Sequence, residues 1–502
     1  MRNALRWTSD TFAESSRQAL QICIVVAVIT LLARLPFLIQ PGFSIDSYLA
    51  VLGSPNAGNF LQQGRFGQYL LLVGTESLGV DTRTLGTLLQ GPGLACFAAA
   101  VPLLFMTFGT HTPVPRMGVV LASLIITLHP FSAEMLTFPE ASFAAHLSTA
   151  LGILSVYLVA RHPGRWRLGA VLLVVALSLY QMLLNYVGLM LLFGAVQLLL
   201  REDAAGRSII DRLRPMRVPV LMVVAGVAVY LLIGKLVVAG AGIAVKGRSQ
   251  LLALDALSLR MDEMGRLSAW LWKSPLIVSE APAAGILLWS CSLLGWAAFM
   301  GWLLVRHSRA SAVGLLITAL IPLAAIGIVG VTAAWWPVPR VLGGIVVAWA
   351  MGVYWLLVLS PPRWRWVPAI PVALVLLGTA GVGHRIYNDQ IKLNRIDRHL
   401  AGEIFRSLNT LPGYKNGTQV AIVNRNMQWA HPLPLSTSYM DMNMTAFAFN
   451  GTQKGVLQMT VGRPVNIINP TPAHALICDT IPFWPTAGFT AMTAAGDAVV
   501  CL

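Results

Sequence analysis

The sequence predicts a polytopic α-helical membrane protein that carries a small water-exposed α/β domain at its C-terminal end. Three observations support this fold class. Of the 502 residues, 56% are hydrophobic and only 11% are charged, whereas soluble domains carry about a quarter charged residues. The apolar residues form runs long enough to cross a hydrocarbon layer of about 30 Å. After about Gly383 no such run occurs, and charged and amide residues return.

We place about eleven membrane-spanning helices in the region 1–383. They are expected at 20–39, 85–107, 117–132, 142–160, 168–182, 183–200, 217–237, 284–305, 312–331, 341–359 and 366–383. The first run follows acidic as well as basic residues and precedes no small-residue cleavage site, so we expect it to be retained as a span. The run 170–200 is divided in two because one helix of that length would overshoot the bilayer. A single long helix there is the alternative.

The positions of the basic residues predict a cytoplasmic N-terminus. Arginines are concentrated in segments such as 161–167 and 201–217, which would then face the cytoplasm. Cytoplasmic loops are enriched in Lys and Arg, so this bias sets the orientation, and an odd number of spans puts the C-terminal end outside. The same bias explains the net charge of +15 better than a nucleic-acid partner does.

Two loops on the exported side are long, at 40–84 and 239–283. In the second, apolar residues between Leu251 and Leu271 recur every three or four positions with charges between them, which is typical of an amphipathic helix lying in the membrane interface. A shorter stretch of the same kind extends from Phe60 to Val73 in the first loop.

The region 384–502 is expected to form a compact α/β domain. A helix is predicted at 391–411, and strands are predicted at 418–424, 464–468 and 498–502. Its two cysteines, Cys478 and Cys501, are expected to form a disulfide in an oxidising compartment, with free thiols as the alternative. The other cysteines fall in spans, where single thiols are usually inert packing residues.

The first exported loop contains a carboxylate, Asp46, in a turn rich in Pro and Gly, and returns to the membrane through Gly64 and Arg65. Most acids in such loops are merely solvated. Here a candidate base and a candidate cation lie at one interface, as proton abstraction from a hydroxyl and phosphate binding would require. In the next exported loop, Glu140 precedes the fourth span and is either a helix N-terminal acid or a second catalytic acid. Glu134 in the same loop has no basic partner nearby in sequence.

Five further residues are candidates for binding a substrate. Tyr180 and Gln181 lie where the fifth and sixth spans meet, as interfacial anchors or as hydrogen-bonding groups for a hydroxylated ligand. Arg340 follows two tryptophans and suits phosphate or sugar recognition. Placing the charge of Arg34 in the first span costs free energy unless the side chain reaches the interface or binds an anion. His129 is either a buried hydrogen-bonded residue or a phosphate contact.

Several familiar chemistries are missing from the sequence. It contains no Walker loop, no CxxC or HExxH pattern and no G-x-S-x-G elbow. ATP-driven transport and zinc-dependent hydrolysis are therefore disfavoured. A carboxylate-centred reaction at the exported face is the chemistry that the residues favour.

Several short motifs, taken in order, resemble the bacterial GtrII-type glucosyltransferases that modify O-antigen. They are Asp46 followed by Gly64-Arg65-Phe66, then Glu140-Ala141-Ser142, Leu179-Tyr180-Gln181, Arg340-Val341-Leu342-Gly343-Gly344 and the late segment PFWPTAGF. Each motif is short, and the resemblance rests on their order along nearly the whole chain.

The resemblance implies a GT-C fold in the bacterial inner membrane, an undecaprenyl-phosphate-linked sugar as donor, and reaction on the periplasmic side. The acceptor would be a lipid-linked or nascent glycan, and Asp46 would be the catalytic base. The chain has one acid in Ile45-Asp46-Ser47 where members of the family often have two adjacent ones. We therefore expect catalysis without a metal or other cofactor.

The expected activity is inverting transfer of a hexose, with glucose favoured, to a hydroxyl of O-antigen or another surface polysaccharide precursor. Arg65, Arg340 and His129 would stabilise charge on phosphate, and Glu140, Tyr180 and Gln181 would orient the sugars. Two alternatives stay open. One is a flippase or transporter of a lipid-linked sugar, for which ionisable residues at mid-membrane would be expected. The other is an O-antigen polymerase or ligase, which the long loop 239–282 allows.

Overall fold

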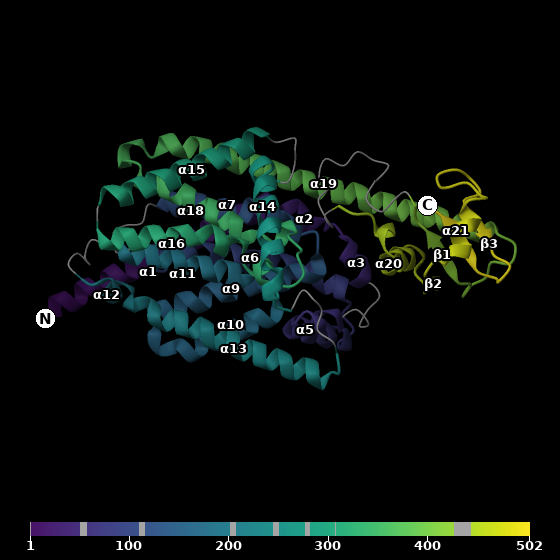
Figure 1. Ribbon diagram of the computed structural model, residues 1–502, viewed down its shortest axis with the longest axis horizontal. Helices are drawn as coiled ribbons and strands as arrows, with labels where there is room; N and C mark the ends of the chain where they lie inside the picture. The colour runs from purple at the N-terminus through teal and green to yellow at the C-terminus, as the bar shows by residue number, and fades with distance from the viewer. Residues whose placement is uncertain are drawn as a thin grey trace.

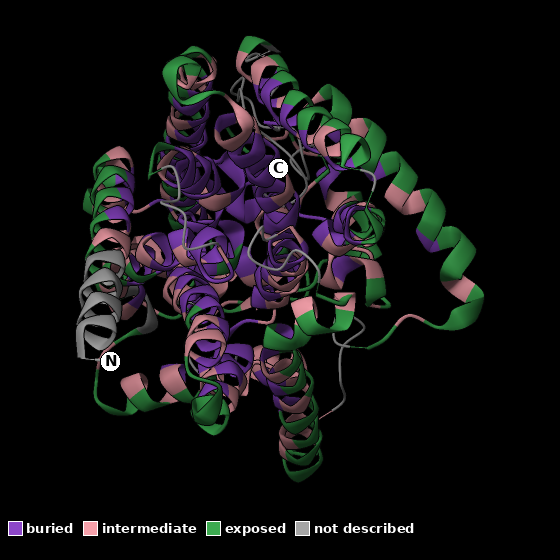
Figure 2. Ribbon diagram, turned by 90° about the vertical axis from the view of Figure 1, so that its left-hand side faces the viewer, coloured by how far each residue is buried: buried purple, intermediate pink, exposed green. Residues whose placement is uncertain are grey.

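The structure is a long bundle of helices that ends in a small sheet-bearing part (Figure 1). It is a computed structural model that describes residues 2–50, 58–109, 116–200, 207–243, 250–276, 282–306, 308–425 and 443–502. In the view along the bundle, buried residues fill the centre and exposed ones form the rim (Figure 2). The outer residues are largely apolar, as expected of helices that face lipid.

Each of the eleven apolar runs is helical. The helices are α1 (Arg2–Ala33) continued by α2 (Leu35–Ile39), α6 (Thr82–Met106), α7 (Arg116–Leu128), α9 (Pro139–Arg161), α10 (Trp166–Leu179), α11 (Leu183–Leu199), α13 (Arg217–Gly240), α15 (Pro282–Val305), α16 (Arg309–Ile326), α18 (Gly343–Leu359) and the first part of α19 (Trp366–Thr410). Within the described residues, six helical segments are long and apolar enough to cross a membrane, and four shorter apolar helices accompany them. The chain is thus a helical membrane protein, and the count of eleven spans stays a prediction.

The long apolar run 170–200 is divided into two helices. α10 ends at Leu179, and α11 begins at Leu183. Tyr180, in extended conformation, is the C-cap of α10. The break places Tyr180 and Gln181 in the turn between two helices, where the backbone no longer follows a helical path.

Glycines bring neighbouring helices into direct backbone contact. A Cβ at Gly295 of α15 would lie 1.8 Å from the carbonyl oxygen of Gly352 in α18. A Cβ at Gly86 of α6 would lie 2.5 Å from the carbonyl oxygen of Pro139, at the start of α9. Small residues are the usual means of close helix packing in membranes, where apolar surface alone gives little driving force.

Short helices build the loops at the end of the bundle that lies next to the sheet. The first loop contains α3 (Ile45–Ala50), α4 (Gly58–Gln62) and α5 (Phe66–Ser77), and the next contains α8 (Pro130–Met135). α14 (Leu257–Lys273) and α17 (Ile328–Val331) belong to later loops, whereas α12 (Ile209–Leu213) lies at the opposite end of the bundle, near the N-terminal helix (Figure 1). α14 is the amphipathic helix expected in the second long loop, and it crosses the bundle direction in Figure 1.

The C-terminal part contains a four-stranded sheet of order β2-β1-β4-β3. β1 (Val420–Val423) pairs in parallel with β2 (Ile467–Ile468) and β4 (Ala498–Cys501), and β3 (Thr490–Met492) pairs antiparallel with β4. The three expected strands are present, and β3 is an additional one. Helices α20 (Asn450–Val461) and α21 (Pro472–Cys478) accompany the sheet, and Cys478 and Cys501 form a disulfide.

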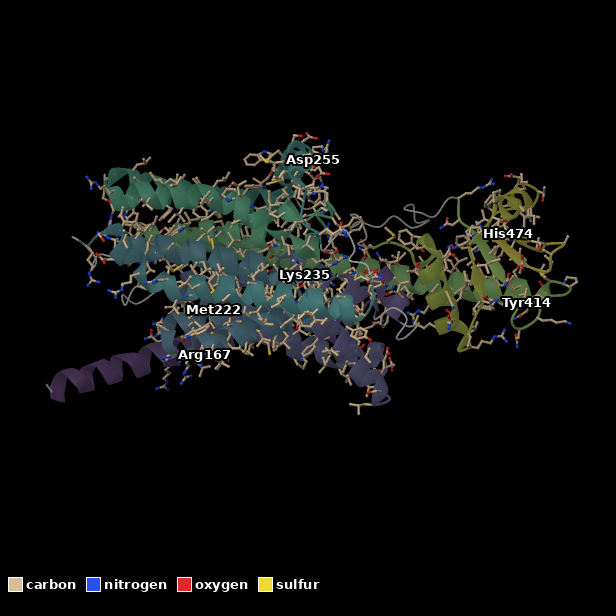
Figure 3. All side chains as sticks on the ribbon, turned by 60° about the horizontal axis from the view of Figure 1, so that its bottom comes forward. Arg167, Met222, Lys235, Asp255, Tyr414 and His474 are labelled. Carbon is tan, nitrogen blue, oxygen red and sulfur yellow. A yellow bond between two sulfur atoms is a disulfide. The ribbon has the colours of Figure 1, made fainter. Side chains whose placement is uncertain are left out.

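No break in the backbone marks the expected boundary at 383/384. α19 is one continuous helix of 45 residues, and the helix expected at 391–411 is its second half. Arg167 lies toward the end from which the N-terminus projects, whereas Tyr414 and His474 lie at the opposite end (Figure 3). Segments predicted to face opposite sides of a membrane are therefore at opposite ends of the structure.

Candidate active site

Asp46 lies in the first turn of α3, and its side chain is exposed. Hydrogen bonds attach this short helix to the loop around α8 and α9. Upstream of Asp46, the Ser44 backbone N–H donates to the carbonyl of Thr137 at 2.8 Å. Downstream, the Ser47 hydroxyl donates to Oε2 of Glu140 at 2.8 Å. The structure thus brings the two acids singled out in the sequence to one place.

Glu140 lies in the first turn of α9, where the helix dipole favours a negative charge. Its Oε1 is buried and has no hydrogen-bond partner among the residues that the structure describes. The charges of Asp46 and Arg340 both act on this carboxylate. Gln68 of α5 donates to the backbone carbonyl of Glu140 at 3.3 Å. Glu140 is therefore a partly desolvated acid between a second acid and a cation.

Arg340 forms a buried ion pair with Glu134 of α8. Its backbone N–H donates to Oε2 of Glu134 at 2.5 Å, and its Nη1 donates to Oε1 at 2.8 Å. The Arg340 side chain is 8% exposed and that of Glu134 is fully buried. The guanidinium also lies over the ring of Phe138, 4.2 Å from its centroid. Glu134 is not among the candidate site residues from the sequence, where the absence of a nearby base is the only signal of a distant partner.

Gly64 and Arg65 form a second cluster with the turn between α10 and α11. The Arg65 guanidinium lies 4.0 Å from the centroid of the Tyr180 ring, and its Nε donates to Oε1 of Gln181 at 3.4 Å. Gln181 Nε2 donates to the hydroxyl of Tyr230 at 2.8 Å, and that hydroxyl donates to the carbonyl of Gly64 at 3.0 Å. The sequence had predicted an arginine, a tyrosine and an amide here. Their mutual contact is a finding of the structure.

Glycine is required at position 64 for two reasons. Its φ is +73°, in the left-handed region that side chains rarely adopt. A Cβ there would also lie 2.7 Å from the Tyr230 hydroxyl. The conformation of Gly64 turns the chain so that Arg65 faces Tyr180, which gives the Gly-Arg-aromatic motif a physical basis.

A small cavity lies beneath this end of the bundle, with a volume of about 40 Å³. Tyr180 and Arg340 line it, as do four polar residues that are not among the candidates from the sequence, namely Ser132, His146, Thr149 and Tyr186. A water molecule needs about 10 to 15 Å³ measured in this way. The cavity therefore has room for a few waters, and the charge of Arg340 in its wall also acts on Glu140.

Arg34 and His129 are not among the residues that line this cavity, and their predicted substrate-binding role stays a prediction. Arg34 is fully buried, and its Nη2 donates to the carbonyls of Leu128 and His129 at the end of α7. The His129 side chain caps α8 by accepting from the Phe131 N–H at 3.3 Å. Its ring packs against Phe131 and Trp349. Each side chain thus satisfies backbone groups at a helix end, while Nε and Nη1 of Arg34 and Nε2 of His129 are buried without a hydrogen-bond partner among the described residues.

The described residues contain no group of three or more His, Cys, Asp or Glu side chains that could hold a metal ion. The expectation of metal-independent catalysis concerns the reaction itself and stays a prediction.

Comparison with known protein families matches residues 35–357 to Glucosyl transferase GtrII. The match includes all of the acids and cations of the candidate site. Neither the curated proteins nor the solved structures contain a match. Because the family match covers more than half of the chain and includes every motif that suggested it except the last, the chain belongs to the GtrII glucosyl transferase family.

Proposed function

We propose that this glucosyltransferase moves glucose from undecaprenyl phosphate to a hydroxyl of O-antigen or another surface polysaccharide precursor, at the periplasmic face of the bacterial inner membrane. The observation that carries the proposal is the meeting of Asp46 and Glu140, from two separate loops, at the end of a membrane helix bundle. The family match supplies the reaction class.

Asp46 acts as the general base. Its exposed carboxylate accepts the proton of the acceptor hydroxyl as the hydroxyl oxygen attacks C1 of glucose. The bond between C1 and the phosphate oxygen breaks, and its electron pair leaves with undecaprenyl phosphate. Attack opposite the leaving group inverts the anomeric centre. Glu140 is less accessible and already accepts from Ser47, so it orients the acceptor rather than competing as the base.

Arg65 is the better placed of the two cations to stabilise the departing phosphate. The charge of Arg340 is already offset by Glu134 at 2.8 Å. Arg65 is half-buried, and the Tyr180 ring and Gln181 orient its guanidinium. A guanidinium held in this way can donate two parallel hydrogen bonds to phosphate oxygens. Arg340 then serves to shape the cavity wall beside the reacting sugar.

The donor reaches the site from the membrane interface near α14. Leu254, Leu257 and Met261 in and before this helix are more than half exposed, which suits insertion into the outer part of a bilayer. Arg260 of the same helix is 3% exposed and donates to the carbonyls of Val329, Thr332 and Ala333 at 2.7 to 3.1 Å. The helix is thereby fixed to the loop that leads to Arg340.

The test is transfer in proteoliposomes that contain the purified protein and a lipid-linked glycan acceptor. Labelled undecaprenyl-phosphate glucose should give labelled glycan, whereas UDP-glucose and undecaprenyl-diphosphate glucose should not. The rate should not change on addition of EDTA. Transfer from UDP-glucose, or passage of the labelled lipid across the bilayer without glycan labelling, would contradict the proposal.

A further inference from the structure

The short helix that carries Asp46 has a second set of contacts, on the side away from α8 and α9. These contacts are with the C-terminal part of the chain, beyond the family match, to which nothing described so far assigns a role. We propose that α20 and the polar face of α19 are positioning elements that set the place of Asp46 relative to Glu140. The inference rests on the proposed function and deepens it.

The first contact is a pair of side-chain amides from α19 that hold the backbone just before α3. Asn394 accepts from the Phe43 N–H at 2.8 Å and donates to the Phe43 carbonyl at 2.7 Å. Gln390, one helical turn earlier, donates to the same carbonyl at 2.7 Å. Both hydrogen-bonding groups of Phe43 are thus satisfied by α19, three residues before Asp46.

The second contact is direct packing of α20 on α3. A Cβ at Gly455 would lie 1.9 Å from the carbonyl oxygen of Tyr48, and a Cβ at Gly451 would lie 2.7 Å from Cδ2 of Leu49. The two glycines are one helical turn apart on one face of α20. They allow the backbone of α3 to approach closer than any side chain would permit.

The third contact places a residue of α3 inside the C-terminal core. Tyr48 is 1% exposed and belongs to a cluster of buried residues that includes Leu400, Phe447 and Val456. Its hydroxyl accepts from Asn394 at 3.1 Å. Tyr48 lies two residues after Asp46, so burial of Tyr48 on the C-terminal side leaves Asp46 at the surface next to Glu140.

These contacts matter because α3 has only six residues. An isolated helix of that length is not stable in water, so its position is set by docking. Ser44 and Ser47 attach it to the membrane part, while Phe43 and Tyr48 attach it to the C-terminal part. The helix that carries Asp46 therefore contacts both the membrane part and the C-terminal part, and the position of Asp46 depends on both.

Gly455→Ala tests this directly, with Gly402→Ala of α19 as the matched control. At Gly455 the Tyr48 carbonyl would have to move from 1.9 Å to at least 3.0 Å from the new Cβ. At Gly402 a new Cβ would meet nothing within 4 Å in the described part of the chain. A misplacement of about 1 Å can lower the rate by about 100-fold. We expect Gly455→Ala to lower kcat by about 10- to 100-fold with the donor KM within about two-fold, and Gly402→Ala to change neither.

Asn394→Ala is the second variant, because it removes the amide clamp without adding bulk. It should also lower kcat and leave the donor KM unchanged. Asn394→Gln should not restore kcat, since the longer side chain displaces the amide from Phe43. Resistance of Cys478 and Cys501 to thiol labelling, together with normal expression, shows that the C-terminal part is folded in each variant.

Amide hydrogen exchange of the segment 43–50 gives a readout that does not depend on the reaction. Exchange should be faster in Gly455→Ala and Asn394→Ala than in the native protein, and unchanged in Gly402→Ala. Native exchange and native kcat in both variants would overturn the positioning role. Inactivity of the native protein toward undecaprenyl-phosphate glucose would instead contradict the proposed function, while the exchange measurement would still decide whether α20 and α19 hold α3.

Discussion

The buried pair of Glu134 and Arg340 allows the structural and chemical roles of a site residue to be separated. Arg340→Met keeps an apolar stem of similar length and removes the charge. It leaves Oε1 of Glu134 without the donor that now lies 2.8 Å away, on a side chain that is fully buried. The Oε2 atom keeps its hydrogen bond from the backbone N–H of residue 340.

The magnitude follows from burial and distance. Two unit charges 2.8 Å apart attract each other by about 6 kcal/mol at an effective dielectric constant of about 20. The cost of taking both charges out of water offsets much of this attraction, so the intact pair adds little net stability. Removing one partner leaves the other charge buried alone, which typically costs about 3 to 5 kcal/mol.

A double-mutant cycle with Glu134→Gln measures this coupling. The amide oxygen of the substituted side chain can still accept from the backbone N–H of residue 340, and the Arg340 charge that loses its partner is 8% exposed and still interacts with the charge of Glu140. Thermal unfolding in detergent, followed by tryptophan fluorescence, should show a large loss of stability for Arg340→Met and a smaller loss for Glu134→Gln. The double variant should be more stable than the sum of the single effects predicts, by about 2 kcal/mol or more. Effects that add to within about 0.5 kcal/mol would refute the assignment of a buried, coupled pair.

Three further predictions concern single positions. Gly64→Ala should raise the donor KM by at least about ten-fold, because the new Cβ would collide with the Tyr230 hydroxyl and displace Arg65. Initial rates over a range of donor concentrations measure this, and an unchanged KM would contradict it. Gly295→Ala should lower the thermal unfolding midpoint, because its Cβ would lie 1.8 Å from a backbone carbonyl of α18; Gly301→Ala of the same helix, which meets nothing within 4 Å in the described structure, is the control. Burial raises the pKa of Asp397, beyond the apolar part of α19, from 3.8 to about 7. Between these pH values the folded chain binds more protons than the unfolded chain, so the free energy of unfolding should fall as the pH rises from about 4 to about 7. In Asp397→Asn the free energy of unfolding should no longer depend on pH in this way.

Features that depend on local composition could be predicted from the sequence. Each apolar run became a helix because its length and hydrophobicity leave the backbone no other way to satisfy its hydrogen bonds in lipid. The break at Tyr180 and Gln181 followed from helix length alone. The three predicted strands lie in short apolar runs, whereas β3, Thr490–Met492, has no run of large apolar residues to identify it.

Features that depend on distant contacts could not be predicted in this way. Glu134 and Arg340 are 206 positions apart, and only the packing of α8 against the loop before α18 brings them together. Asp46 and Glu140 were both candidates, yet their proximity depends on the docking of α3. The contacts of Arg34 could not be predicted either, because a charge near a helix end can reach an interface or donate to carbonyls of a neighbouring helix, and the sequence does not distinguish these cases.

The domain boundary expected at 383/384 likewise depends on contacts that the sequence does not show. Composition changes there, as the polar residues of α19 face Phe43 and the C-terminal core rather than lipid. The backbone continues as one helix across this change. A shift in composition thus identified where the surroundings of the helix change, and it did not identify an end of the helix.

The central claim is that Asp46 is the base of glucose transfer. The most direct test is the rate of transfer from labelled undecaprenyl-phosphate glucose in a single turnover, comparing Asp46→Asn with Asp81→Asn. Asp81 caps α6 at the end of the same loop, and Asn caps a helix equally well. The account predicts that Asp46→Asn lowers the rate by about 100-fold or more, with donor binding retained, and that Asp81→Asn has the native rate. A native rate in Asp46→Asn would contradict it and would point to Glu140 as the base.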